Sequence, residues 1–124
     1  MAQKKALIID DDDSILDIMQ IIISDMGLET FAFASWTSET IQSIITIKPD
    51  IIFLDEWLVG IRGSEICIIL KSINQLRTVP IILVSGAQDL AQVAQKALAD
   101  GYIHKPFEIT DIEKMVGRFS PIYN

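Results

Sequence analysis

The 124-residue chain has one cysteine, few basic residues, and no apolar run near the roughly 20 residues that cross a bilayer. Cys67 has no partner within the chain, which excludes an internal disulfide and leaves no cysteine-based zinc site. Ten basic against 17 acidic residues give a formal charge of −7, which argues against binding to a nucleic-acid backbone. We therefore expect no membrane segment and no direct nucleic-acid contact.

The N-terminus also lacks the features of a secretory signal. Lys4 and Lys5 precede only a short apolar stretch and then four consecutive aspartates, which no signal peptide would contain. The expected location is therefore the cytoplasm. The length fits one domain, which we expect to span residues 1–124, with a core at about 4–119 and a frayed tail at 120–124.

Apolar residues make up half of the chain and occur in two alternating patterns. Five short runs rich in β-branched or aromatic residues predict strands at residues 6–9, 28–33, 51–54, 81–84 and 102–103. Between and after them, apolar residues recur at helical spacing and predict five buried stripes. The stripes are Ile15, Ile18, Met19, Ile22 and Met26; Ile41, Ile44 and Ile45; Ile66, Ile69, Leu70 and Ile73; Leu90, Val93, Ala94, Ala97 and Leu98; and Ile109, Ile112, Val116 and Phe119.

This alternation predicts an α/β fold of five βα units, (βα)5, in which a parallel five-stranded sheet is covered by helices on both faces. Right-handed crossovers favour a doubly wound sheet of order 2-1-3-4-5. Polar residues follow the predicted strands: Asp10 and Asp11 after the first, Asp55 after the third, Ser85 after the fourth and Lys105 after the fifth. Because parallel strands end at the same edge, we expect these side chains to converge there.

Three converging carboxylates repel one another unless one takes up a proton or a cation lies among them. An all-oxygen set with few protein ligands suits Mg²⁺, which keeps several waters and reaches substrate phosphate. The ammonium of Lys105 and the hydroxyl of Ser85 would compensate the charge of a phosphoryl group. The pattern predicts Mg²⁺-dependent phosphoryl transfer to Asp55.

The segments ALIIDDDDSI, KPDIIFLDEWLVGIRG, VPIILVSGA and GYIHKPF resemble the receiver domains of bacterial response regulators, and the resemblance covers essentially the whole chain. It implies the flavodoxin-like receiver fold and a role as a two-component or phosphorelay signalling protein. Such a domain is not an enzyme acting on a separate substrate, although it assists its own phosphorylation and dephosphorylation. Its phosphoryl group switches a partner-binding face.

The resemblance also implies a role for each site residue. Asp55 would accept the phosphoryl group from a phosphohistidine on a histidine kinase or histidine phosphotransferase. Asp11, Asp55 and the backbone carbonyl of Trp57 would hold Mg²⁺, with Asp10 acting often through water. The downstream partner is not indicated, and a homodimer is left open.

Further residues would couple the acceptor to the switch. Lys105 would pair with the acceptor, and the bond from Lys105 to Pro106 would be cis. Ser85 would move to the phosphoryl group while Tyr102 turns inward, although Tyr102 also fits the pattern of an ordinary core aromatic residue.

Two positions near the acceptor are expected to set how long the phosphoryl group persists. Trp57 should lie at the rim, because a βα loop at a ligand edge is usually exposed. Its indole would hinder water in line with the phosphoryl bond, and Ala87 offers no polar group to guide that water. These two residues predict a long-lived phosphorylated form.

Some of these residues also fit other interpretations. Asp12 and Asp13 fit a helix N-cap and first turn, and His104 fits a strand end and not a ligand. A pseudo-receiver that binds partners without phosphorylation is the alternative function, although such domains normally lose an acidic ligand, the acceptor or the lysine. A magnesium phosphatase would need a second acid at Trp57, and a flavin carrier would need a phosphate-binding loop after the first strand.

The chain also departs from the family pattern at three positions. Val59 replaces a proline and Arg62 an aspartate, which implies a looser and less acidic loop after the acceptor. Leu98 stands where a helix-terminating glycine is common, so the fourth helix is expected to be short or shifted.

Overall fold

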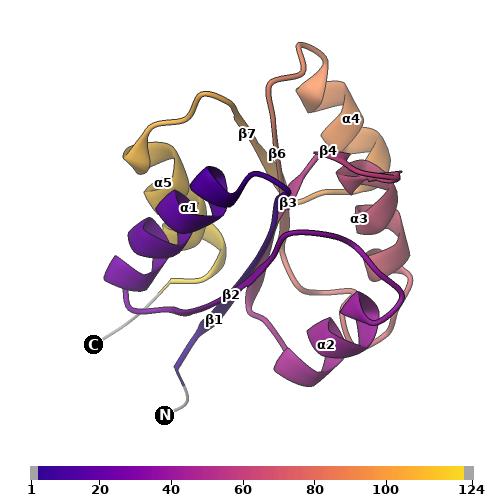
Figure 1. Cartoon of the computed structure of the whole chain (residues 1–124), viewed down its shortest axis with the longest axis horizontal. Helices are drawn as coiled ribbons and strands as arrows, with labels where there is room; N and C mark the ends of the chain where they lie inside the picture. Colours follow the sequence, from indigo (N-terminus) through magenta and orange to yellow (C-terminus); the bar gives the residue numbers. More distant parts are fainter. Residues whose placement is uncertain (1–2, 122–124) are drawn as a thin grey trace.

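The computed structural model describes residues 3–121, which form a parallel sheet between two layers of helices (Figure 1). The sheet order is β2-β1-β3-β6-β7, all pairs being parallel, which confirms the predicted order 2-1-3-4-5 once the sheet strands alone are counted. These strands are β1 (Lys5–Ile9), β2 (Glu29–Phe33), β3 (Ile51–Asp55), β6 (Ile81–Ser85) and β7 (Gly101–His104). Each lies within one residue of its predicted bounds.

The helices divide between the two faces of the sheet. They are α1 (Asp13–Asp25), α2 (Thr40–Ile47), α3 (Gly63–Lys71), α4 (Leu90–Ala97) and α5 (Ile109–Phe119). Helices α1 and α5 cover one face, and α2, α3 and α4 cover the other (Figure 1). No helix of residues 3–121 is both long enough and apolar enough to span a membrane.

The core follows from the two-residue period of the strands. Leu54 of β3 faces the core under α2, α3 and α4, whereas its neighbour Phe53 faces the core under α1 and α5. Both β3 and β6 are buried along their whole length because each has a strand on either side and helices above and below. Asp55 and Ser85, the last residues of these strands, are thereby held at the edge of a rigid layer.

Several residues assigned to the buried helix stripes are exposed instead, which corrects the prediction for Ile18, Ile69, Leu98 and Ile109. In the first helix Met19 and Ile22 are buried as predicted, and Leu16 and Ile23 are buried with them. Helical spacing identifies an apolar face wider than the sheet covers, so residues at its margin reach solvent. Ile18 and Ile109 instead border a groove of about 470 Å³ between α1 and the start of α5.

The fourth helix is short, as expected, and ends in an unusual conformation. Helix α4 has 8 residues, and its C-cap Leu98 has φ 63, in the left-handed region that glycine adopts most easily. The Leu98 side chain is 69% exposed, so burial does not compensate this conformation. Lys48, at the end of α2, is the second such residue in the described chain.

The segment after Asp55 is a short hairpin. Strand β4 (Trp57–Leu58) pairs antiparallel with β5 (Ile61–Arg62), and the turn contains Gly60 at φ 85. The hairpin leads into α3 through Gly63, where any Cβ atom would collide with the backbone carbonyl oxygen of Asp55. Glycine is therefore required for this close approach.

The predicted frayed tail is described only in part. Ser120 is the buried C-cap residue of α5, so the first residue of this segment belongs to the packed structure. Residues 122–124 lie outside the described residues.

Candidate phosphoacceptor site

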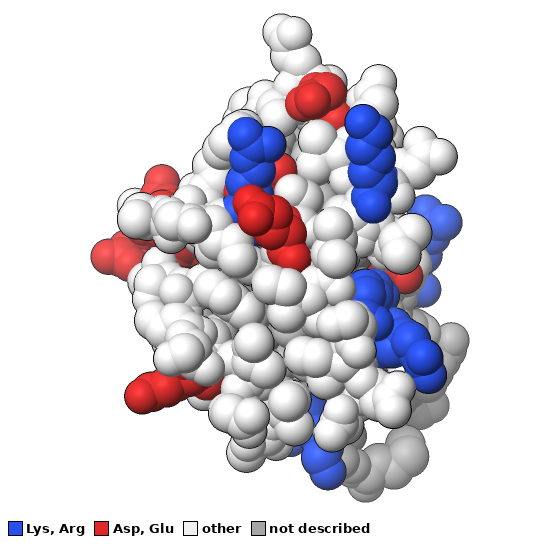
Figure 2. All heavy atoms as spheres, turned by 90° about the vertical axis from the view of Figure 1, so that its right-hand side faces the viewer, with Lys and Arg blue, Asp and Glu red and all other residues white. Residues whose placement is uncertain are grey.

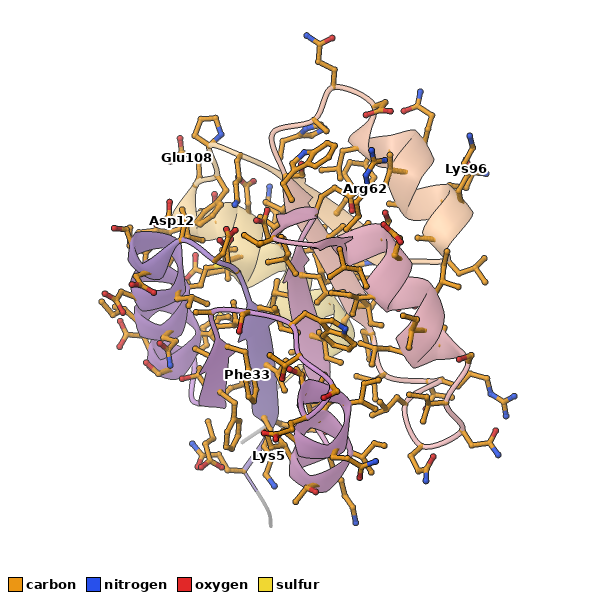
Figure 3. The ribbon with its side chains drawn as sticks, turned by 45° about the vertical axis from the view of Figure 1, so that its right-hand side comes forward. Lys5, Asp12, Phe33, Arg62, Lys96 and Glu108 are labelled. Atoms are coloured by element: carbon orange, nitrogen blue, oxygen red, sulfur yellow. The ribbon has the colours of Figure 1, made fainter. Side chains whose placement is uncertain are left out.

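The polar residues predicted to converge are found at one edge of the sheet. Asp10 follows β1, Asp55 and Ser85 end β3 and β6, and Lys105 follows β7. Figure 3 shows the labelled Asp12, Arg62 and Glu108 toward this edge and Lys5, at the start of β1, toward the opposite one.

Lys105 joins the two buried carboxylates. Its Nζ donates hydrogen bonds to Asp10 Oδ2 at 2.9 Å and to Asp55 Oδ1 at 3.1 Å. Asp10 is 2% exposed and Asp55 is 6% exposed, so neither charge is well solvated. The ammonium therefore supplies the positive charge that this pair requires.

Burial and Asp10 both raise the pKa of Asp55 above its ordinary value, and they outweigh the lowering effects of Lys105 and a hydrogen bond to the Trp57 backbone. For Lys105, burial alone would lower the pKa, but hydrogen bonds and charge from Asp10 and Asp55 raise it overall. Lys105 consequently stays charged at neutral pH, while ionised Asp55 lies in an unfavourable environment. An added cation would relieve that environment.

Asp10, Asp11 and Asp55 form a group suited to a metal ion. Each offers one carboxylate oxygen, and these atoms lie within 4.8 Å of one another. Asp11 is exposed at the outer side of the two buried carboxylates, so an ion there keeps access to water. A sparse all-oxygen set that leaves room for water fits Mg²⁺.

The four consecutive aspartates belong partly to the carboxylate cluster and partly to the start of α1. Asp12 is the N-cap of α1, and its carboxylate accepts hydrogen bonds from the backbone N–H groups of Ser14 and Ile15. Its own backbone N–H donates to Asp10 Oδ1 at 2.9 Å. The N-cap prediction for Asp12 is confirmed, and the cap also orients a site carboxylate.

Ser85 and Lys105 are linked through the backbone. The Ser85 side chain is fully buried, and its Oγ accepts a hydrogen bond from the backbone N–H of Ala87 at 3.1 Å. The backbone N–H of Lys105 donates to the Ser85 carbonyl at 2.9 Å. The Lys105–Pro106 peptide bond is cis, as the resemblance implies.

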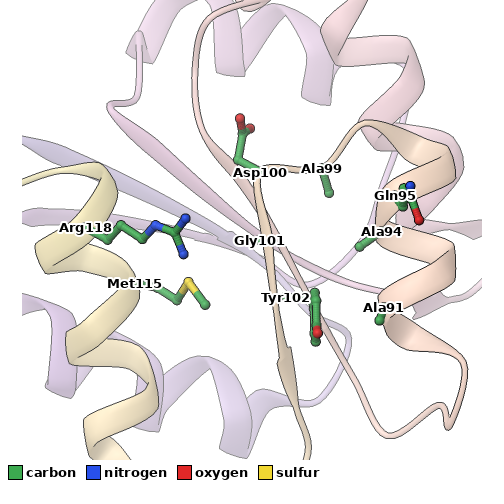
Figure 4. A pocket seen from close by; sticks show the side chains of 9 residues that line it. All are labelled: Ala91, Ala94, Gln95, Ala99, Asp100, Gly101, Tyr102, Met115 and Arg118. Carbon is green, nitrogen blue, oxygen red and sulfur yellow. The ribbon is translucent and has the colours of Figure 1, made fainter.

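Tyr102 points away from the core in this structure. Its ring is exposed and makes an edge-on contact with His104, the ring centroids being 5.7 Å apart. It borders a pocket of about 530 Å³ between α4 and α5, which owes its depth to small residues such as Ala91, Ala94 and Gly101 (Figure 4). The outward position of Tyr102 corrects the ordinary core interpretation.

Trp57 lies at the rim, as predicted, with its side chain 55% exposed. Arg62 pairs with it across the hairpin, and the Cζ atom of Arg62 lies 4.8 Å from the centroid of the indole ring. In the sequence, Arg62 stands out only because it replaces the aspartate of the family pattern. The cross-strand register, which creates this contact, cannot be read before the hairpin is known.

Glu56 is a site-adjacent residue that sequence reasoning missed. Its carboxylate is buried and accepts hydrogen bonds from the Ser64 backbone N–H at 2.7 Å and from Ser64 Oγ at 2.9 Å. An acidic residue directly after a buried strand was the available signal. The pair ties the end of β3 to the first turn of α3.

The receiver-domain resemblance agrees with independent comparisons. Sporulation initiation phosphotransferase F of Bacillus subtilis is 28% identical over 122 residues, which cover 98% of each chain. The DNA-binding response regulator MtrA of Mycobacterium tuberculosis is 28% identical over 108 residues, 86% of this chain and 46% of that protein. The chain therefore spans about half the length of MtrA and of its counterparts from other mycobacteria.

Solved structures give the same result for the fold. A putative response regulator from Chloroflexus aurantiacus superposes with a TM-score of 0.88 at 28% identity, over 95% of this chain and 98% of that one. The chemotaxis protein CheY4 of Vibrio cholerae, at 23% identity and a TM-score of 0.85, shares the fold. The family model described as the response regulator receiver domain matches residues 6–117. The chain thus belongs to the response regulator receiver domain family of two-component systems.

Proposed function

We propose that this chain is a phosphoacceptor that takes a phosphoryl group onto Asp55 from a phosphohistidine. An oxygen of the Asp55 carboxylate attacks phosphorus, the P–N bond to the donor imidazole breaks, and its electron pair returns to that nitrogen. The observation that carries the proposal is the Lys105 ammonium between buried Asp10 and Asp55. No other lysine or arginine of residues 3–121 bridges two carboxylates.

The surroundings favour Asp55 over Asp10 as the acceptor. Asp10 uses one oxygen for the Asp12 backbone and the other for Lys105. Asp55 ends the central strand β3, between Asp10, which follows β1, and Ser85 at the end of β6. Its phosphoryl group would meet Lys105 on one side and the Ser85 hydroxyl on the other, and these donors favour the charge that develops during transfer.

Asp10, Asp11, Asp55 and the backbone carbonyl of Trp57 would hold Mg²⁺. That ion would neutralise phosphoryl oxygens and permit Asp55 to react as a carboxylate. The raised pKa of Asp55 supports this assignment, because a nearby cation favours its ionised form.

The switch would connect the acceptor to the face formed by α4, β7 and α5. Ser85 Oγ would exchange its Ala87 contact for the phosphoryl group, and exposed Tyr102 would turn inward. The donor would be a histidine kinase or histidine phosphotransferase in the cytoplasm, and the face would bind a downstream protein or a second copy. A phosphorylation-independent pseudo-receiver is the second candidate, but it gives no reason for an intact set of Asp11, Asp55 and Lys105.

The deciding experiment is incubation with acetyl phosphate and Mg²⁺ followed by intact-mass measurement. One phosphoryl adduct should form, require Mg²⁺ and be released by hydroxylamine, as an acyl phosphate is. Asp55→Asn should remove it, while Asp50→Asn, at a carboxylate of the opposite sheet edge, should not. An adduct that persists in Asp55→Asn refutes the assignment, and no adduct at all favours the pseudo-receiver.

Magnesium binding is tested separately with Asp11→Asn and Asp12→Asn. Both remove one exposed negative charge, but asparagine still caps a helix, so Asp12→Asn preserves α1. Asp11→Asn should weaken Mg²⁺ binding by about tenfold or more, equal to about 1.4 kcal/mol, because it removes a direct ligand. If calorimetric titration shows that both variants lose Mg²⁺ affinity equally, the ion is attracted by general charge and Asp11 is not a ligand.

A further inference from the structure

The hairpin of β4 and β5 carries a contact that the acceptor chemistry does not use. Trp57 and Arg62 are directly paired across the two strands, and the guanidinium lies over the indole at 4.8 Å. Trp57 is 55% exposed and stands two residues after the acceptor. Within residues 3–121, no carboxylate forms an ion pair with Arg62. The indole is thus the main partner of this guanidinium.

The base of the hairpin is fixed against the acceptor strand. Glu56 accepts two hydrogen bonds from Ser64, and the Gly63 backbone N–H donates to the Glu56 carbonyl at 3.0 Å. Gly63 also packs so closely on the Asp55 carbonyl that no side chain fits. The backbone of the hairpin therefore has little freedom relative to Asp55, and the remaining freedom belongs to the outer side chains.

An exposed indole on a fixed backbone samples several rotamers unless something holds it. A guanidinium stacked on an exposed ring supplies an attraction that shifts rotamer populations by about two- to fivefold. The backbone N–H of Arg62 donates to Glu65 Oε1 at 3.3 Å, which ties the arginine to the first turn of α3. Arg62 can therefore hold Trp57 from a fixed position.

We propose that Arg62 is a positioning residue that holds the Trp57 indole at the mouth of the acceptor site and thereby slows hydrolysis of phosphorylated Asp55. This inference rests on the proposed function, since it concerns how long the acyl phosphate persists. Water must approach phosphorus in line with the bond to the Asp55 oxygen, and a held indole obstructs that approach more often than a free one. Arg62 itself need not touch the phosphoryl group.

The experiment is a double-mutant cycle that measures decay of the phosphorylated protein with saturating Mg²⁺ and no kinase. Arg62→Gln should speed decay about two- to fivefold in the parent chain. In a Trp57→Ala background, which keeps the backbone carbonyl, Arg62→Gln should change the rate little. Arg62→Lys should restore part of the slow decay because it keeps a cation.

The matched control is Arg118→Gln, which removes an arginine stacked at 5.0 Å on Phe119 of α5, outside the acceptor site. It should leave the decay rate unchanged. Equal acceleration by Arg62→Gln with and without Trp57 would show that Arg62 acts through its charge and overturn the proposal. No acceleration in the parent chain would overturn it as well.

A spectroscopic measurement separates this inference from the proposed function. Trp36 and Trp57 are the two tryptophans, so Trp36→Phe isolates Trp57 fluorescence. Arg62→Gln should then increase acrylamide quenching of Trp57 before any phosphorylation, and unchanged quenching would overturn the holding role. If Asp55 accepts no phosphoryl group, the proposed function fails and the lifetime role of Arg62 fails with it. Normal phosphorylation with unaltered decay refutes the Arg62 inference alone.

Discussion

Asp55 is placed where its chemistry conflicts with folding stability. Burial and Asp10 raise its pKa, so the folded protein holds this proton more tightly than the unfolded chain does. Ionising Asp55 therefore costs stability, and the protein loses stability as the pH rises from the unfolded value through the raised one. The surrounding strands keep the Asp55 carboxylate in place despite this cost.

Because ionising Asp55 costs stability, we expect Asp55→Asn to change the melting temperature of the metal-free protein, measured with a chelator present. At neutral pH the variant should have a higher melting temperature than the wild type, because asparagine carries no buried charge. The gain should shrink as the pH falls toward the ordinary aspartate range, where wild-type Asp55 becomes protonated. With Mg²⁺ present, the wild type should have the higher melting temperature, because the ion stabilises it more than the variant. Thermal unfolding at several pH values checks this, and a destabilised variant at pH 7 would contradict it.

Trp57 gives the second prediction at the scale of single residues. Because its exposed indole stands at the rim, Trp57→Asn should shorten the lifetime of phosphorylated Asp55 by about tenfold, or roughly 1.4 kcal/mol of barrier. Asparagine also offers a polar group that can guide water, which Ala87 does not. The measurement is decay of the phosphorylated protein at saturating Mg²⁺. A variant that decays at the wild-type rate or more slowly would show that the indole does not shield the bond.

At this scale, the sequence located residues that end strands and missed those defined by contacts. Asp10, Asp55, Ser85 and Lys105 were found because strand order brings strand ends together. Glu56 was missed because its partner Ser64 belongs to the next helix, and no periodic pattern connects the two. The limit is physical, since the position of a strand end follows from topology whereas a side-chain contact requires the local backbone.

Among the elements, α4 ends in an unfavourable backbone conformation. Its N-cap Asp89 makes no side-chain hydrogen bond to the helix, and Leu98 ends it at φ 63. A left-handed conformation costs a leucine roughly 1–2 kcal/mol, and 69% exposure returns little of that through packing. The structure therefore contains a specific and removable source of instability.

Leu98→Gly should accordingly stabilise the protein, by about 0.5–1 kcal/mol after the added freedom of glycine in the unfolded chain is subtracted. In thermal unfolding this corresponds to a rise of about 2–4 °C for a chain of this size. Gln95→Gly, at an exposed position within α4, is the opposite control and should destabilise by about 1 kcal/mol. A Leu98→Gly variant that unfolds at a lower temperature would show that the leucine side chain makes a compensating contact.

The elements of the sheet were more predictable than the helices and the hairpin. Strands β3 and β6 are buried on both faces, so every residue is apolar until the terminal Asp55 and Ser85. The hairpin of β4 and β5 has only two residues in each strand, too few for an alternating pattern. In the sequence, the only sign of its turn is Gly60, and a single glycine does not distinguish a hairpin turn from a loop.

Across the whole molecule, the site and the expected output face share the strands β6 and β7. Ser85 ends β6 at the proposed acceptor site, while Tyr102 on the adjacent β7 borders the pocket between α4 and α5. The face that carries α2, α3 and α4 shows a broad area without charged side chains (Figure 2). Helix α4 belongs to this layer and also lines the pocket beside Tyr102, so a shift of this helix would change that pocket.

We expect a change at Asp55 to be transmitted to α4. In the wild type, Mg²⁺ with beryllofluoride should change amide hydrogen exchange in α4 and β7 by about fivefold or more, as expected of an allosteric coupling. Lys105→Met removes the ammonium that binds Asp10 and Asp55, so the added charge is no longer tied to β7. This variant should keep its fold and lose most of the exchange change.

Lys96→Met is the matched control, because it removes an exposed lysine from α4 itself without touching the acceptor. It should retain the exchange response of the wild type, and exchange in β1 and β3 should stay constant in all three proteins. Mass measurement after acetyl phosphate treatment shows whether Lys105→Met still takes the phosphoryl group. If it does, and α4 responds as in the wild type, Lys105 is not the connection, and Ser85 alone must carry the signal from β6 to β7.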